Sequence, residues 1–155
     1  MKRIICTLAL VIYSLYIAKA QNLVGVWQEN TPEVAATYIN SYSFFSDGTF
    51  HYNTNGFNGL NRILTIGGKY KTENNNLDFH VEYTIELVGG TLERSMTETL
   101  SDSWSIIDGK IEKIPLRNKL IEKVSFIGIS NIDDKEYIII DKIRYYKVSD
   151  CPNNE

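Results

Sequence analysis

The stretch YSFFSDGTFHY, residues 42–52, places aromatic side chains on both sides of one tight turn. Ser46-Asp47-Gly48 has the composition of a three-residue hairpin loop, because Gly48 can take the left-handed backbone conformation that such a loop requires. The alternative is a two-residue loop, which shifts the pairing of the flanking strands by one residue. Since a one-residue slip moves every side chain of a strand to the opposite face, the apolar pattern decides between the two loops.

The three-residue loop matches aromatic residues with each other. It sets Phe44 opposite Phe50, and one pair further from the turn it sets Tyr42 opposite Tyr52. The two-residue loop instead pairs Phe44 with His51 and mixes polarity on both faces. We therefore expect the four rings to point inward, either as ordinary core or as the wall of a ligand cavity. A buried tyrosine hydroxyl needs a partner, and another side chain, water or a ligand can supply it.

The rest of the chain predicts an all-β fold. Turn signals recur along it, and short runs rich in Ile, Val, Thr, Tyr and Phe lie between them, as in a sandwich or barrel. LDFHVEYTIEL, residues 77–87, alternates most clearly, which places Phe79 and Tyr83 on an apolar face and predicts one long, one-sided strand. We expect strands near residues 23–29, 37–45, 49–54, 63–72, 77–88, 91–100, 103–108, 110–114, 120–129 and 136–148.

Two segments leave alternatives open. PLRNKLIEKV, residues 115–124, spaces apolar residues four apart after a proline and fits a short helix or a strand. Residues 91–106, read as one strand, would put Arg94, Glu98 and Asp102 on an apolar face, where buried charges can mark a site. A turn at 101–103 would reset the alternation, and we favour it because Ser-Asp-Ser is good turn material.

The N-terminus predicts export. Residues 1–20 combine Lys2 and Arg3 with an apolar run and end in Ala18-Lys19-Ala20, the pattern of a secretory signal peptide cleaved after Ala20. The exported chain would then be one domain over residues 21–150 with a short tail at 151–155, located in a periplasm or outside the cell.

Charge narrows the range of partners. The chain has a net charge of −3, and removal of the three basic residues of the signal lowers it by three units to −6. No run of basic residues remains, which argues against nucleic acid and against an anionic membrane surface. No second apolar stretch is long enough for a membrane span after signal removal.

Four short motifs then occur in a familiar order. Gly25-Val26-Trp27 precedes the Phe44–Phe50 hairpin, and Ile66-Gly67-Gly68-Lys69-Tyr70 and Asn75-Asn76-Leu77 follow. This order resembles the lipocalin-like family of small secreted bacterial proteins, which are relatives of the lipocalins in the calycin group. The resemblance covers residues 23–80. It implies an eight-stranded antiparallel up-and-down β-barrel, lipocalin-like, and our own strand count of eight to ten is compatible with it.

The resemblance also implies two structural roles. In lipocalins a tryptophan of the first strand closes one end of the barrel, and an arginine of the last strand packs across it. Trp27 matches the first role, and Arg144 is the candidate for the second by position. Such a contact joins a cation–π interaction to a cover over the core.

These features together predict a secreted, non-enzymatic, lipocalin-like barrel that binds a small apolar or amphipathic molecule inside. No cofactor or metal is expected, because Asp78, His80 and Glu82 share a strand face at about 6.6–7 Å spacing, which is awkward for one ion. The expected wall residues are Tyr42, Phe44, Phe50, Tyr52, Phe79 and Tyr83, with Tyr70 and Trp104 as weaker candidates.

Two other functions stay open at this point. A barrel filled by its own side chains could act as an interaction or surface module through exposed loops such as residues 53–61, with Phe57 and Leu60 at its surface. An enzyme is the third hypothesis, with Arg94, Glu98 and Asp102 as the first groups to inspect. The sequence contains no Gly-x-Ser-x-Gly, His-Glu-x-x-His or phosphate-loop motif to support it.

Overall fold

The fold is all-β, as the sequence predicts. The structure, a computed structural model, describes residues 23–33, 39–56, 59–73, 75–94 and 104–152. Eight strands and no helix occur within these ranges. The strands are β1 (Gly25–Glu29), β2 (Ser41–Phe44), β3 (Thr49–Asn53), β4 (Ile63–Glu73), β5 (Asn76–Arg94), β6 (Trp104–Ile132), β7 (Lys135–Ile140) and β8 (Ile143–Ser149).

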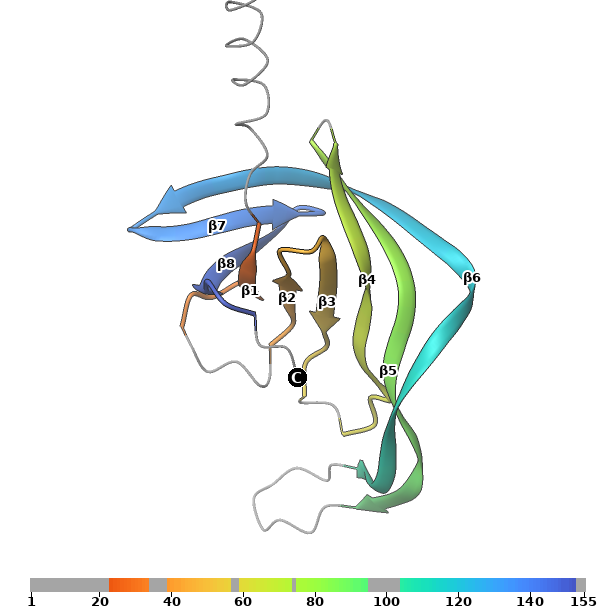
Figure 1. Ribbon diagram of the computed structural model, residues 1–155. Coiled ribbons are helices and arrows are strands. Elements are labelled where there is room, and N and C mark those ends of the chain that lie inside the picture. Colours follow the sequence, from red (N-terminus) through yellow and green to blue (C-terminus); the bar gives the residue numbers. More distant parts are fainter. Residues whose placement is uncertain (1–22, 34–38, 57–58, 74, 95–103, 153–155) are drawn as a thin grey trace, which may run out of the picture.

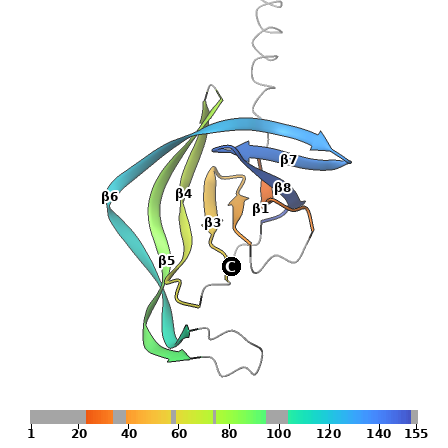
Figure 2. The ribbon, with the colours of Figure 1, turned by 180° about the vertical axis from the view of Figure 1, so that it is seen from behind.

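The strands form one ring-shaped antiparallel sheet (Figure 1). Each strand pairs with the next one along the chain, and β8 pairs with β1, so that the sheet closes on itself. The view from behind shows the same order, with the short strands β1, β2 and β3 on one side and the long strands β4, β5 and β6 on the other (Figure 2). Closure places one face of every strand in a common interior.

The hairpin of residues 42–52 has the predicted register. Tyr42 lies opposite Tyr52 and Phe44 opposite Phe50. Gly48 takes a φ of +82°, the left-handed conformation expected of the loop. The backbone N–H of Thr49 donates a hydrogen bond of 2.9 Å to the carboxylate of Asp47, which fixes the turn.

The interior is largely apolar. The four hairpin rings face it together with side chains from all of the longer strands, which is the result that the aromatic register predicts. The buried core consists of Leu23, Trp27, Phe44, Phe50, Leu77, Phe79, Val81, Phe126, Ile138, Ile140 and Tyr145.

The predicted division of residues 91–129 into separate strands is wrong. β5 continues to Arg94 and β6 runs from Trp104 to Ile132, and the two pair as one long ribbon. Gly89 and Gly109 lie opposite each other in this pairing, and left-handed residues occur on both strands at this level. Both strands therefore bend together here, and the turn signals mark a kink in the ribbon instead of a reversal. Part of the predicted strand 91–100 lies outside the described residues.

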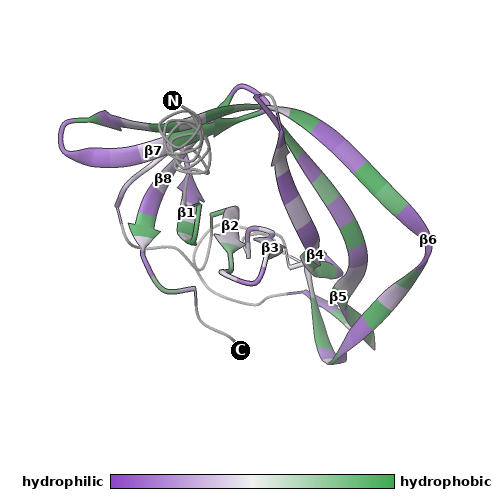
Figure 3. Cartoon of the chain, turned by 45° about the horizontal axis from the view of Figure 1, so that its top comes forward, coloured by the Kyte–Doolittle hydropathy of each residue, from purple (hydrophilic) through white to green (hydrophobic). Residues whose placement is uncertain are grey.

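Residues 115–124 form strand and not helix. Their pairing with β5 is irregular, since β5 advances by two residues from Val81 to Tyr83 while β6 advances by five, from Leu120 back to Pro115. The surplus residues lie where β6 bows outward from the ring, as the view tilted by 45° shows (Figure 3). The apolar residues spaced four apart, which also fit a helix, thus lie in a strand that contains a bulge.

The β5–β6 ribbon extends beyond the ring and carries exposed apolar side chains. Leu92 is 55% exposed and Ile111 is 69% exposed. In the described part of the chain, β6 pairs with β7 only from Phe126 onward, so its earlier residues leave an edge. Lys110, Lys113 and the bulge lie along this edge, and such features limit edge-to-edge aggregation.

A substitution at Gly68 tests the close contact between β4 and β5. A Cβ atom at this position would lie 2.1 Å from the carbonyl oxygen of His80, which is backbone and cannot rotate away. We expect Gly68→Ala to lower the free energy of unfolding by about 1–3 kcal/mol, measured by urea denaturation. Lys69→Ala, at an exposed neighbour, is the control with little expected change. Equal stability of the two variants would contradict this packing.

Candidate functional site

A cavity of about 270 Å³ lies inside the ring. Seven strands and the turn between β7 and β8 contribute to its wall, so its shape depends on closure of the whole sheet. Its lining consists of Tyr42, Phe50, Tyr52, Ile66, Phe79, Val81, Glu122, Val124, Ile140, Asp141, Ile143 and Tyr145.

Tyr42 is the centre of the aromatic side of this cavity. Its ring stacks on Phe79 with a centroid distance of 5.3 Å and an interplanar angle of 9°. It also meets Tyr145 edge-on at 5.1 Å and lies 4.7 Å from Tyr52. Offset and edge-to-face geometries are the favourable arrangements for aromatic pairs. The wall is therefore a set of rings that hold one another in place.

The cavity also contains polar groups. Within the described residues, no hydrogen bond involves the hydroxyls of Tyr42, Tyr52 or Tyr145. Burial raises the pKa of Tyr42 far above its ordinary value, with further increases from Tyr145, Tyr52, Glu122 and Asp141. Burial is likewise the main cause of the raised pKa values of Tyr145 and Tyr52. All three phenols are therefore neutral at physiological pH and can donate or accept a hydrogen bond.

Two carboxylates stand at the mouth of the cavity. Glu122 on β6 lies opposite Phe79 in the pairing of β5 with β6. Asp141 lies in the turn between β7 and β8, with a φ of +48°. Both residues are exposed, while the rings beside them are buried or half-buried. The described lining contains neither Lys, Arg nor His, so its charged groups are acidic.

Six of the eight predicted wall residues and weaker candidates lie in or beside the cavity. Tyr42, Phe50, Tyr52 and Phe79 line the cavity. Phe44 is fully buried and belongs to the core beside it. Tyr70 packs edge-on against Phe44 at 4.8 Å and lies outside the lining, and this leaves it a supporting position.

The predicted inward position of Tyr83 is wrong. The strand pairing shifts between Val81 and Tyr83, and after this shift Thr84 is the buried residue of β5. The bulge reverses the alternation, so Tyr83 lies on the outer face, where its ring covers Gly67.

Tyr83 instead forms an outer cluster that the sequence reasoning missed. Its hydroxyl lies 2.7 Å from Nε2 of His51, and the ammonium of Lys113 lies 3.5 Å from the centre of its ring. Burial, and then the charge of Lys113, lower the pKa of His51. The cluster borders a surface hollow of about 420 Å³ that Phe45 and other residues line. In the sequence, Gly67 is a small residue within a strand, which can indicate a close contact. In the structure its strand neighbours are the large residues His51 and Tyr83.

Trp104 also lies outside the cavity, contrary to prediction. It is 47% exposed and pairs with Arg94 on the ribbon beyond the ring. Two strands alone have no opposite wall, so a side chain at this position cannot face an interior.

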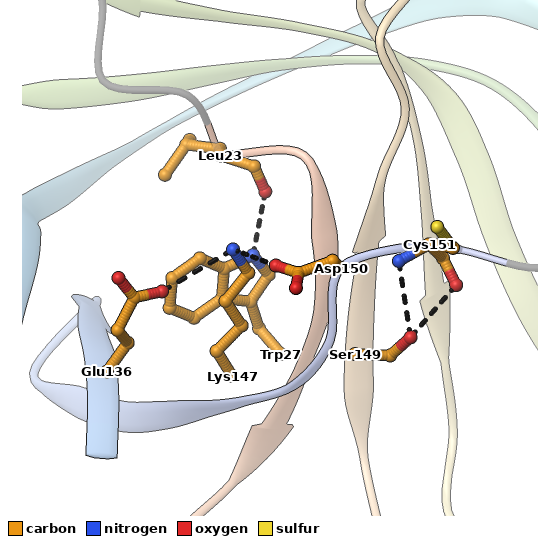
Figure 4. Close-up of polar contacts among 7 residues, drawn as sticks. All are labelled: Leu23, Trp27, Glu136, Lys147, Ser149, Asp150 and Cys151. Carbon is orange, nitrogen blue, oxygen red and sulfur yellow. Dashed lines mark hydrogen bonds and ion pairs between the residues drawn. The ribbon is translucent and has the colours of Figure 1, made fainter. Parts of the chain in front are cut away.

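Trp27 is fully buried, and its indole N–H donates a 2.7 Å hydrogen bond to the carbonyl of Leu23 (Figure 4). The prediction that Arg144 packs across it is wrong. Arg144 lies over Tyr137 at 4.7 Å and donates a hydrogen bond to the hydroxyl of Tyr146. Lys147, three residues later and opposite Trp27 in the β1–β8 pairing, takes that place with its ammonium 5.7 Å from the indole.

Lys147 connects two acidic residues beside this tryptophan (Figure 4). Its ammonium lies 2.6 Å from Asp150 and 3.4 Å from Glu136. The hydrogen bond that the Lys147 ammonium donates to the Asp150 carboxylate is the main cause of the raised pKa of Lys147. This network joins β7, β8 and the residues that follow β8. Its role is therefore structural.

The other candidate groups do not converge. Asp78 and Glu82 lie 3.7 Å from the ammonium groups of Lys123 and Lys69 respectively, along the outer face. Across the described ranges no three His, Cys, Asp or Glu side chains come close enough to hold a metal ion. Arg94 is exposed. Glu98, Asp102 and Phe57, together with the predicted signal at residues 1–20, lie outside the described residues, whereas Leu60 is 47% exposed.

Comparison of the chain with protein-family models, with curated proteins and with solved structures found no match. Among the residues that the structure describes, no helix is long and apolar enough to cross a membrane.

Tyr42→Phe tests the burial of the cavity hydroxyls. An unfolded chain loses the Tyr42 proton near pH 10.0, whereas the folded chain keeps it to higher pH. Above that pH the unfolded state binds fewer protons than the folded state. The free energy of unfolding therefore falls as pH rises. Between pH 8 and pH 11 the wild type should lose about 1 kcal/mol more than the variant in urea denaturation. At pH 8 the two should differ by less than about 1 kcal/mol, because the deleted hydroxyl has no hydrogen-bond partner among the described residues. Parallel losses in both proteins would contradict this burial.

Proposed function

We propose that this protein is an exported, non-enzymatic, lipocalin-like binding protein that holds one small apolar or amphipathic molecule inside its ring of strands. The observation that carries the proposal is the interior cavity of about 270 Å³ with its aromatic wall. Ligand sites combine a mostly apolar lining with a few polar groups that fix orientation. The rings and hydroxyls of Tyr42, Tyr52 and Tyr145 supply both.

The size of the cavity supports a small ligand. Typical sites for drug-sized molecules enclose about 300–1,000 Å³, so a cavity of about 270 Å³ suits a molecule of one ring or one short chain. The order of strands, each antiparallel to the next, is compatible with the lipocalin-like family that the sequence resembles.

A protein-interaction module is the second candidate. The exposed apolar side chains of Leu92, Trp104 and Ile111 on the β5–β6 ribbon favour it, because contiguous apolar surface marks interaction sites. The cavity favours the first candidate, since an interior packed entirely by its own side chains would leave no such space.

Filling the cavity should abolish binding. Indole is a suitable neutral probe, and we expect the wild type to bind it with a Kd of about 10 μM to 1 mM, followed through methyl resonances of Ile66 and Ile140 by NMR. Val81→Trp places a large ring where a buried valine lines the cavity and should weaken binding at least about tenfold.

Trp104→Ser is the matched control, because it removes an exposed ring of the ribbon and leaves the cavity wall intact. Indole binding should survive in this variant, and both variants should keep the wild-type pattern of amide resonances. Loss of binding in Trp104→Ser with retention in Val81→Trp would reject the interior site and favour the ribbon.

Export is a separate part of the proposal. The charged start, apolar run and Ala18-Lys19-Ala20 ending support cleavage after Ala20. Expression of the full chain in an exporting bacterium should yield a protein whose N-terminal sequencing begins at Gln21. Recovery of the intact chain from the cytoplasm would contradict this prediction, and Ala20→Pro, which blocks cleavage, should leave the precursor associated with the cell membrane.

A further inference from the structure

We propose that the interior ligand is an organic cation, an apolar body that carries an ammonium group. This inference rests on the proposed function and adds the charge of the ligand. It comes from two features of one cavity, the aromatic wall and the acidic mouth, which lie directly against each other.

The charges around the cavity all have the same sign. Glu122 and Asp141 belong to the described lining, which has no basic side chain to neutralise them. The nearest basic residues in sequence lie elsewhere: Lys123 pairs with Asp78 on the outer face, and Lys142 and Arg144 line a separate surface hollow. A ligand that enters past this mouth therefore meets a negative potential.

The wall behind the mouth suits the same ligand. Five aromatic residues line the cavity, Tyr42, Phe50, Tyr52, Phe79 and Tyr145. The face of an aromatic ring attracts a cation, and this attraction increases when the site excludes water. Several rings around one cavity are the usual means of recognising alkylated ammonium groups.

Other ligand charges fit less well. An anion would lose its hydration inside an apolar space and would face Glu122 and Asp141 without a compensating cation. A neutral molecule would fill the space but would leave both carboxylates without a partner from the ligand. The phenol groups of this wall are neutral and so offer an anion no compensating positive charge.

Three probes of similar shape separate these cases. Phenyltrimethylammonium, tert-butylbenzene and benzenesulfonate have the same number of non-hydrogen atoms and differ in charge. Titration of the full-length gene product, as purified, should show the cation binding at least about tenfold more tightly than tert-butylbenzene, with no measurable binding of benzenesulfonate. NMR shifts of methyl groups in the lining would place the bound probe.

Charge variants test the role of the mouth. Glu122→Gln and Asp141→Asn should each weaken binding of the cation about threefold to tenfold and leave tert-butylbenzene unchanged. Asn tolerates the positive φ at position 141, so the turn is preserved. Glu82→Gln is the control, because it changes the net charge equally at an exposed outer position beside Lys69.

The outcomes are distinct. Equal or tighter binding of tert-butylbenzene would overturn the cation inference and leave the proposed interior site standing. An equal effect of Glu82→Gln would mean that net charge alone sets the preference, which would also overturn it. If none of the probes, indole included, binds a folded protein, both the inference and the proposed function fail.

Discussion

The antiparallel pairing of β1 with β8 determines the rest of the structure, because it turns a twisted sheet into a ring. The pairing joins residues near the two ends of the described chain, with Trp27 opposite Lys147. Trp27 is fully buried at this junction, and its hydrogen bond to Leu23 and the ammonium of Lys147 hold it there (Figure 4). An isolated sheet of these strands would expose its aromatic face to water, whereas the closed ring gives that face an interior.

The interior is unequally filled, and this inequality produces the cavity. The short strands β2 and β3 contribute four large rings to one side. On the other side β6 bows outward at its bulge and contributes Glu122 and Val124 to the cavity lining. Aromatic bulk on one side and distance on the other leave a space between them. The same bulge also carries Leu116 and Leu120 into solvent.

Much of this architecture follows from the sequence. The hairpin register at residues 42–52 could be predicted because loop chemistry and aromatic matching agree, and four of the rings face inward as expected. The positions of Tyr83, Trp104 and Arg144 could not be predicted in the same way. Tyr83 follows a bulge that reverses the alternation of β5, and Trp104 lies where the ribbon has left the ring.

Arg144 shows a related limit. Its identity as a basic residue on the last strand agrees with the resemblance, but side-chain alternation and a shift in the β1–β8 pairing give Lys147 the position beside Trp27. Bulges and pairing shifts depend on contacts between distant strands, and a single sequence carries little local signal for them. The acidic mouth of the cavity was missed for the same reason, since Glu122 and Asp141 come together only through the order of β5, β6 and β7.

The central claim is that the ring encloses a site for a small organic molecule. The most direct measurement is a crystal structure of the purified protein soaked with bromobenzene, whose bromine can be located by anomalous scattering. The account predicts one principal anomalous peak inside the ring, in contact with Tyr42, Phe79 and Tyr145. A structure in which side chains fill the interior, with bromine only on the outer face of the β5–β6 ribbon, would contradict it.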